Sequence, residues 1–325
     1  MQCRSPSAPL ARYAIKRILS IIPICLVLSL LVFAMIHLVP GDLAIVLVGP
    51  NHTPETLAKI RESLGLTLPV HVQYLRWLSK AVRGDLGDSF YLHGPVLPEV
   101  LTRFRASLLL AGGSFAFAIP LGIFVGVTSA LRRGSILGQA MMFPTMVGIS
   151  IPPFYLGMLL IIVFSVRFQW LPSGGMFSVT EEPTLRGILQ HLVLPVLALA
   201  GAPFAVVARM VRASALEVLR KDYIRTAHAK GLNGRRVIWR HASKNLLIPV
   251  ISLISLQIGY LLSATALVEV VFSWPGLGSL IVQSILTRDL PLTQGCVLVI
   301  VCVYVVVNTA ADLLQLSLDP RIKYA

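Results

Sequence analysis

Charged residues are scarce in this sequence. Only 13% of the 325 residues are Asp, Glu, Lys or Arg, whereas 56% are hydrophobic and the mean hydropathy is +0.80. Soluble globular domains carry about 25% charged residues. The composition therefore excludes a soluble globular chain and predicts a membrane protein.

Common catalytic and nucleotide-binding motifs are also missing. Without G-x-x-x-x-G-K-[ST], the chain cannot cradle ATP phosphates by itself. H-E-x-x-H and paired cysteine spacings are absent, and Cys3, Cys25, Cys296 and Cys302 fall in apolar stretches or on the predicted cytoplasmic side. An intramembrane serine protease built on Ser114 has no pairing histidine in the pattern. We therefore expect no enzyme, no cofactor and no metal site in this chain.

Six uncharged apolar stretches are long enough to cross a hydrocarbon core of about 30 Å, given a helical rise of about 1.5 Å per residue. They are Ile18–Val39, Ala106–Leu131, Gly134–Val166, Gly187–Ala208, Asn245–Val268 and Leu290–Ala311. The first exceeds a signal-peptide core and no A-x-A cleavage site closes it, so we expect it to be retained. The sequence predicts an all-α polytopic membrane protein with about six transmembrane helices.

Charge asymmetry predicts the orientation. With the N-terminus inside, cytoplasmic segments hold 18 Lys or Arg against 4 acids, and the opposite side holds 10 of each. The formal charge of +14 therefore lies on the side that the positive-inside rule requires, and a nucleic-acid partner is unnecessary. The predicted parts are a cytoplasmic tail (1–17), the first transmembrane helix (18–39), an external loop domain (40–105) and a five-helix core (106–325) with a cytoplasmic loop at 209–244.

That cytoplasmic loop is strongly basic, with ten Lys or Arg against two acids. Within it, Ser214–Lys230 has apolar residues at three- or four-residue steps, which predicts an amphipathic helix. Gly231 follows as a predicted C-terminal stop, because a helix commonly ends in a left-handed residue. The apolar face needs a partner: the chain's own helices, another protein, or an anionic lipid surface on which a basic helix lies.

The string DYIRTAHAKGL (Asp222–Leu232), followed by RHASKNLLIPV (Arg240–Val250), resembles the cytoplasmic signature loop of membrane subunits of ATP-binding-cassette importers, in their peptide and nickel branch. The superfamily signature is Glu-Ala-Ala, three residues, Gly, and later Leu-Pro. Here the triplet is Arg-Thr-Ala, and Gly231 and Pro249 match the later positions. The missing Glu departs from the sugar and amino-acid branches and fits the peptide branch.

The external loop predicts two helices, Thr53–Leu64 and Val70–Val82. Tyr74 and Trp77 on the second are typical of aromatic side chains at the headgroup level. The strings LGLTLPVHVQYLRWL and RGDLGDS (Arg83–Ser89) also resemble the external domain of the peptide-transporter family. The resemblance implies a surface onto which a binding protein docks.

Two further sites have both a functional and a plainer interpretation. Pro152 and Pro153 interrupt the third apolar stretch; such breaks line a cavity or are simple kinks. The family-like string VEVVFSWPGLG contains Glu269 and Trp274, and Glu269 is the acid nearest the membrane on the outer side. Glu269 contacts a substrate amine, gates the outer mouth, or bonds neighbouring backbone. We place these four residues in a candidate pathway or outer gate.

The resemblance implies a multi-pass permease subunit of the bacterial cytoplasmic (inner) membrane, both termini cytoplasmic. It implies as partners a second similar permease, two ATP-binding subunits that bind the ATP, and an external solute-binding protein. The implied coupling helix contains Leu216, Leu219, Tyr223, Arg225, Thr226, Ala227, Lys230 and Gly231.

For substrate, the expectation is di- or oligopeptides, because no metal-ligand cluster in the spans points to nickel. The alternatives are a nickel-chelate or glutathione-type importer. An ATP-independent secondary transporter is a third possibility, although the spans lack the facing buried charges and the repeats typical of that class.

Overall fold

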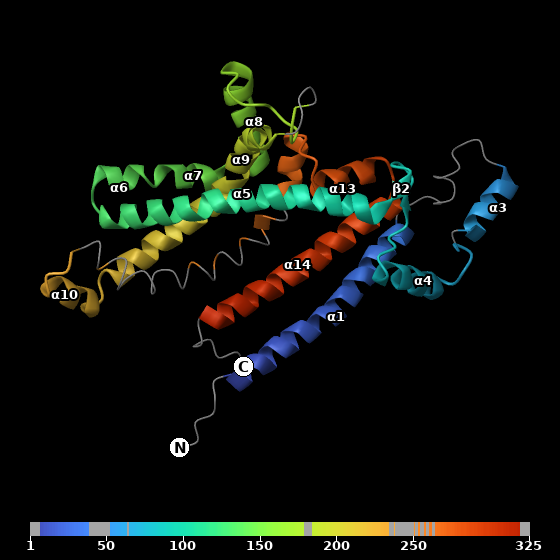
Figure 1. Ribbon diagram of the computed structural model, residues 1–325, viewed down its shortest axis with the longest axis horizontal. Coiled ribbons are helices and arrows are strands. Elements are labelled where there is room, and N and C mark those ends of the chain that lie inside the picture. The colour runs from blue at the N-terminus through green and yellow to red at the C-terminus, as the bar shows by residue number, and fades with distance from the viewer. Residues whose placement is uncertain are drawn as a thin grey trace. The chain divides into compact units, whose positions relative to one another are not determined.

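The computed structural model describes residues 7–38, 53–63, 65–178, 184–233 and 264–318, and six single positions between 234 and 263 (Figure 1). The second signature string, Arg240–Val250 with Pro249, lies outside the described residues except for Val250. Most of the predicted fifth stretch, Asn245–Val268, lies outside them too.

The regular secondary structure of the described residues is helical, apart from one short hairpin. The elements in chain order are α1 (Ser7–Leu38), α3 (Pro54–Ser63), α4 (Val70–Val82), β1 (Asp88–Ser89), β2 (Gly94–Pro95), α5 (Val96–Leu131), α6 (Ile136–Ala140), α7 (Phe143–Ser150), α8 (Pro153–Leu160), the π-helix η1 (Ile161–Arg167), α9 (Leu185–Val218), α10 (Asp222–Ala229), α13 (Leu277–Leu286) and α14 (Leu290–Leu318). Residues 264–271 are also helical. The predicted helical fold class is confirmed.

Three helices of the described residues are long and apolar enough to cross a membrane, and they match the predicted second, fourth and sixth stretches: Val96–Leu131, Leu185–Val218 and Leu290–Ala310. The predicted third stretch is a bent pair, Ile136–Ser150 and Pro153–Arg167, whose halves meet at 111°. If the bent pair counts as one membrane crossing, the described residues contain four candidate crossings. These helices extend beyond the predicted apolar stretches, because a charged residue marks the edge of the membrane but does not end a helix.

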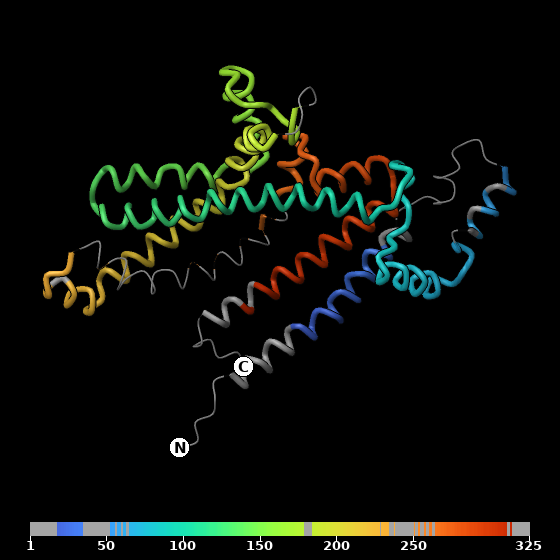
Figure 2. The backbone as a smooth tube through the Cα atoms, viewed as in Figure 1, coloured from blue at the N-terminus to red at the C-terminus, as the bar shows by residue number. Residues whose placement is uncertain are grey.

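The chain forms two compact units, of which the first contains Met1–Arg105 and Ser279–Thr309. Within this unit α1 and α14 run side by side in opposite directions (Figure 2). The Gln294 Nε2 group donates to the Val32 carbonyl at 3.4 Å, and one stretch further along, the thiol of Cys302 contacts that of Cys25. From Gln294 to Cys302 on α14, the contacted residue on α1 changes from Val32 to Cys25. The two helices are therefore antiparallel.

Helix α4 packs its aromatic face on α1 in the same unit. The rings of Tyr74 and Trp77 lie 5.4 and 5.9 Å from the ring of Phe33, measured between centroids, and the Tyr74 hydroxyl is 2.9 Å from the Ser29 hydroxyl. These aromatic residues therefore hold α4 to a helix of the same chain.

The β1–β2 hairpin is fixed by a buried acid at the start of α14. Asp289 is only 1% exposed, and its carboxylate accepts hydrogen bonds from the Ser89 hydroxyl at 2.5 Å and the Tyr91 N–H at 3.0 Å. It also caps α14 by accepting from the Leu292 N–H at 3.1 Å. One carboxylate thus joins the hairpin to the helix.

The second unit contains Ala106–Gly278 and Ala310–Ala325, and its core lies where α5 packs against α9. Leu110 of α5 and Leu199 of α9 are fully buried in this core. Glycines bring the two backbones close: a Cβ at Gly126 would lie 2.6 Å from the Ala208 carbonyl oxygen. Helices α6 and α7 run back alongside α5 (Figure 1), and the Ser129 hydroxyl of α5 donates to the Gly138 carbonyl of α6 at 3.0 Å.

Helices α7 and α9 touch through a pair of glycines. A Cβ added at Gly148 of α7 would overlap the carbonyl oxygen of Gly201 on α9. A Cβ at Gly201 would meet the Leu156 side chain of α8 at 3.4 Å. The bent pair is therefore packed against α9 on both sides of the bend.

Candidate functional site

Helix α10 ends at the predicted glycine. The helix runs from Asp222 to Ala229, and Gly231 has a φ of +75°. The Leu232 N–H donates to the Ala227 carbonyl at 3.3 Å, which is the six-to-one hydrogen bond of a Schellman C-cap. Apart from the chain neighbours of Gly231, no atom of the described residues lies within 4 Å of a Cβ built there, so the positive φ and not side-chain crowding accounts for the glycine. The predicted stop is confirmed.

The start of this helix differs from the prediction of one helix over Ser214–Lys230. Helix α9 continues to Val218, a turn follows, and α10 begins at Asp222. In the turn the N–H groups of Arg220 and Lys221 each bond the carbonyl three residues back, at 3.1 Å. No glycine or proline marks this break in the sequence; the packing of the residues on either side accounts for it.

Side chains on both sides of the turn meet in one small cluster. Val218, Ile224, Ala227 and Val237 are buried there, and Leu219 and Leu232 pack partly buried against them. On a straight helix Val218 and Ala227, nine residues apart, would point to opposite sides. The turn changes the direction of the chain, so that both side chains lie in one cluster. The cluster therefore holds α10 at the end of α9.

The apolar face predicted for the candidate coupling helix is only partly right. Ala227 is buried and Leu219 is half-buried, but Tyr223 is 40% exposed, and Ile224, which the periodicity did not select, is buried at 2%. Because the turn breaks the helical register, the face extrapolated through Leu216 does not continue onto α10. The three-residue spacing of Ile224 and Ala227 would have identified the buried pair.

The surface that α10 presents is polar. Arg225, Thr226 and Lys230 are exposed, and the Thr226 hydroxyl bonds the Asp222 carbonyl of its own helix at 3.0 Å. Arg225 lies 3.8 Å from the Asp222 carboxylate, and both side chains are largely exposed. This surface pair adds little stability, so these side chains are available to a partner surface.

Pro152 and Pro153 lie at the bend between α7 and α8. Pro152 is extended (φ −57°, ψ 139°), and Pro153 is the first residue of α8, where its missing N–H costs no helical hydrogen bond. The Leu156 N–H donates to the Pro152 carbonyl at 2.9 Å. The proline pair therefore ends one helix and starts the next, at the 111° angle given above.

The residues Phe272–Gly276 form a largely buried loop before α13, here named the Trp274 turn. Trp274 is fully buried, and its indole Nε1–H donates to the Ala106 carbonyl at 2.9 Å. Ser273 has a φ of +47°, a conformation that few non-glycine residues adopt. The turn is therefore held tightly to the first residues of the second unit's part of α5.

Glu269 lies beneath the Trp274 turn and is fully buried. Its Oε1 accepts from the Ser107 hydroxyl at 2.6 Å, and the Ser107 oxygen in turn accepts from the Leu277 N–H at 2.8 Å. A Cβ at Gly276 would overlap the Glu269 carboxyl group. This geometry resembles the third interpretation of Glu269, a structural hydrogen bond, although the donor is the Ser107 side chain and not backbone; the Glu269 side chain is fully buried.

Ser107 is the residue in this network that sequence reasoning missed. It lies 162 residues from Glu269 in the chain and carries no motif of its own. A second turn, at Trp170–Gly175, also contacts this region, since the Gly175 N–H donates to the Phe272 carbonyl at 2.8 Å. Only the folded chain brings these segments together.

Among the described residues, no group of three or more His, Cys, Asp or Glu side chains is placed to hold a metal ion. The features that stand out are instead a tightly packed buried turn, a bent helix pair and a small capped helix with a polar surface. Together with the long apolar helices, these features are those of a polytopic membrane protein.

Comparison with known proteins gives the family. Residues 118–324 match the binding-protein-dependent transport system inner membrane component, and residues 10–111 match the N-terminal part of such membrane components. The chain belongs to this family of importer permeases, in the peptide and nickel branch. It is a transport subunit and not an enzyme; in this family ATP is hydrolysed by separate ATPase subunits. The protein is a multi-pass component of the bacterial inner membrane.

Similar curated proteins include glutathione transport system permeases named GsiC. Those of Salmonella paratyphi A and Escherichia coli K12 are 39% identical to this chain, and that of Escherichia coli O6:H1 is 40% identical, each over 96% of this chain and 99% of the relative. The family resemblance inferred from the sequence is confirmed, and an ATP-independent secondary transporter is set aside.

A solved structure supports the fold alone. The MetNI methionine ABC transporter in an inward-facing conformation aligns with a TM-score of 0.52 and 17% identity, covering 69% of this chain and 96% of that chain.

Proposed function

We propose that this chain is a permease subunit of an ATP-driven importer for glutathione or a peptide of similar size. The observation that carries this proposal is the 38–40% identity to GsiC permeases over nearly the whole length of both chains. The relatives favour the glutathione-type alternative over the di- or oligopeptide importer that the sequence pattern favoured, and over a nickel-chelate importer.

The proposed complex contains this chain, a second homologous permease, two ATP-binding subunits and an external solute-binding protein. As an importer permease, the chain works with ATPase subunits and a binding protein; their number and the second permease are part of the proposal. The external loop domain, 40–105, is proposed as the surface for the binding protein. Both termini are proposed to be cytoplasmic, on the charge asymmetry described above.

Helix α10 is proposed to seat in a groove of an ATPase subunit. Its buried side, Ile224 and Ala227, packs on its own chain, and its exposed polar side carries Arg225 and Thr226. Closure of the ATPases around ATP would then move α10, and the turn that joins it to α9 would pass the movement into the membrane helices. A shift from 1:99 to 99:1 between two conformations needs about 5.5 kcal/mol of differential binding.

The bend at Pro152 and Pro153 is proposed to border the pathway, since non-helical backbone at membrane depth persists where it lines a cavity or is buried in protein. Glu269 and Trp274 are proposed to set the shape of the outer mouth. Their burial supports a positioning role for both side chains, through the Trp274 turn, more than contact with the substrate.

Uptake of radiolabelled substrate tests the proposal directly. Cells that express this chain with its partner subunits should accumulate glutathione above cells that lack this chain, and excess unlabelled glutathione should compete better than a dipeptide or a nickel chelate. Preferential competition by the dipeptide would restore the di- or oligopeptide reading. Native mass spectrometry of the complex would count its subunits, and recovery of this chain without ATPase subunits would contradict the proposed assembly.

A further inference from the structure

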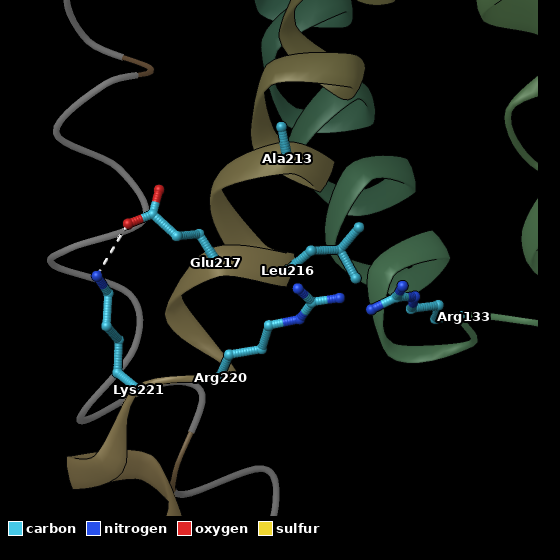
Figure 3. Close-up of a pocket in the computed structure, with 6 residues that line it drawn as sticks. All are labelled: Arg133, Ala213, Leu216, Glu217, Arg220 and Lys221. Atoms are coloured by element: carbon cyan, nitrogen blue, oxygen red, sulfur yellow. Dashed lines mark ion pairs between the residues drawn. The ribbon is translucent and has the colours of Figure 1, made fainter.

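A pocket of about 440 Å³ opens where the end of α9 approaches the α5–α6 turn, within the second unit. Its lining consists of Arg133, Ala213, Leu216, Glu217, Arg220 and Lys221 (Figure 3). These residues lie outside α10, although Leu216 belongs to the predicted coupling helix.

The charges around this pocket do not balance. Glu217 pairs with Lys221, with 3.0 Å between the carboxylate oxygen and the ammonium nitrogen. Arg133 and Arg220 form no ion pair with an acid in the part of the chain that the structure describes. Figure 3 shows their guanidinium groups pointing toward one another across the opening. Two positive groups are thus directed at one space, with the nearby acid already engaged.

Such an arrangement favours an anion. Two guanidinium groups repel each other, and a shared anion replaces that repulsion with charge-assisted hydrogen bonds, because each planar fork can bind two oxygens at once. The best geometric match is a carboxylate or a phosphate. A pocket of this volume is large enough for a phosphodiester group together with part of its glycerol.

The remaining lining and the position of the pocket indicate the source of the anion. Ala213 and Leu216 supply an apolar wall beside the cations. The apolar run of α5 stops at Leu131, directly before the arginine pair at 132 and 133, so the pocket lies where apolar helix gives way to charge. Cations above an apolar wall at this level match a phospholipid, whose phosphate lies above its acyl chains.

We propose that this pocket binds the phosphate of an anionic phospholipid headgroup, with Arg133 and Arg220 as its two ligands. The lipid would hold the end of α9 to the α5–α6 turn and so brace the base from which α10 projects. The proposal goes beyond the proposed function, because it depends on neither the transported substrate nor the ATPase.

Native mass spectrometry of the detergent-purified complex, stripped of lipid and titrated with phosphatidylglycerol, tests this site. The R133Q/R220Q variant should bind phosphatidylglycerol about tenfold more weakly than the unaltered protein, because it lacks two cationic side chains that each attract the anionic headgroup. The matched control is R167Q/R186Q, which removes two exposed arginines of the same unit that lie outside the pocket lining. It should bind as the unaltered protein does.

Unchanged binding by R133Q/R220Q would overturn the proposal. Displacement of the lipid by an equal concentration of inorganic phosphate would also overturn it, in favour of a free phosphate. If the variant instead loses its ATPase subunit while the lipid adducts persist, the anion is an acidic side chain of that partner. Should the variant not fold, the unaltered protein decides: equal affinity for phosphatidylglycerol and phosphatidylcholine overturns the proposal, and a clear preference for the anionic lipid upholds it. Failure of glutathione uptake would leave all these results unaffected.

Discussion

The Trp274 turn and helix α10 are both short connecting segments of the second unit, yet they are stabilised in opposite ways. In the turn, Trp274 and Glu269 are fully buried and hydrogen bonds join them to Ala106 and Ser107. Helix α10 buries only a few apolar side chains and leaves its polar side exposed. The turn is completed inside its own chain, whereas α10 has a surface for something else to complete.

This difference predicts different kinds of mutational damage. Substitutions in the Trp274 turn should lower the stability of the protein, because they disturb close packing and buried hydrogen bonds. Substitutions on α10 should leave the folded protein intact and alter its association with a partner.

Gly276→Ala should cost the most. The added Cβ would overlap the Glu269 carboxyl group, and overpacking of a rigid core costs about 1–3 kcal/mol, occasionally more. The unfolding midpoint of the purified protein should fall clearly. Gly112→Ala is the matched control: no neighbouring atom lies within 4 Å of its Cβ in the interior of α5, so it should be neutral or stabilising by about 0.5–1 kcal/mol. Equal midpoints for the two variants would refute the close packing of the turn.

Ser107→Ala should destabilise by about 1–3 kcal/mol, because it removes a hydrogen bond from both Glu269 and the Leu277 N–H. Ser114→Ala on the same helix removes a buried hydroxyl that, among the described residues, bonds the Leu110 carbonyl of its own helix. It should cost less. Chemical denaturation of the two variants side by side measures the difference, and a larger loss in Ser114→Ala would mean that the Ser107 network does not hold the turn.

Gly231→Val should strain the end of α10 by about 1–2 kcal/mol or more, because a side chain is disfavoured at this positive φ. We expect normal amounts of membrane-inserted protein but transport reduced roughly tenfold relative to ATP hydrolysis. Gly134→Val imposes similar strain, at a φ of +85° and also with open space around its Cβ, but in the α5–α6 turn. Normal uptake by Gly231→Val would remove the end of α10 from the coupling role.

Tyr223→Asp should have the smallest effect on the fold, since Tyr223 is 40% exposed. It should reduce copurification of the ATPase subunit about tenfold if α10 seats in that subunit, because the charge disturbs the interface. Tyr91→Asp, at a 52% exposed tyrosine of the first unit, is the control. Unchanged copurification of Tyr223→Asp would favour the alternative in which the helix lies on lipid.

The same two regions show what the sequence could predict. The glycine stop of α10 was predictable, because a positive φ is a local demand that residue type reveals. The Pro152–Pro153 break was predictable for the same reason. The turn at 219–221 was not, since no residue there breaks a helix and tertiary packing overrides local propensity. The bond between Ser107 and Glu269 was not predictable, because the two residues lie 162 positions apart in the sequence.

The glycine contact between α7 and α9 has a mechanical consequence. Because no side chain separates Gly148 from the Gly201 backbone, the two helix backbones are in direct contact there. A movement of one end of α9 would therefore displace the bent pair directly at this contact, instead of being taken up by side-chain repacking. Any larger residue at position 148 would act as a wedge, opening the contact and weakening that transmission.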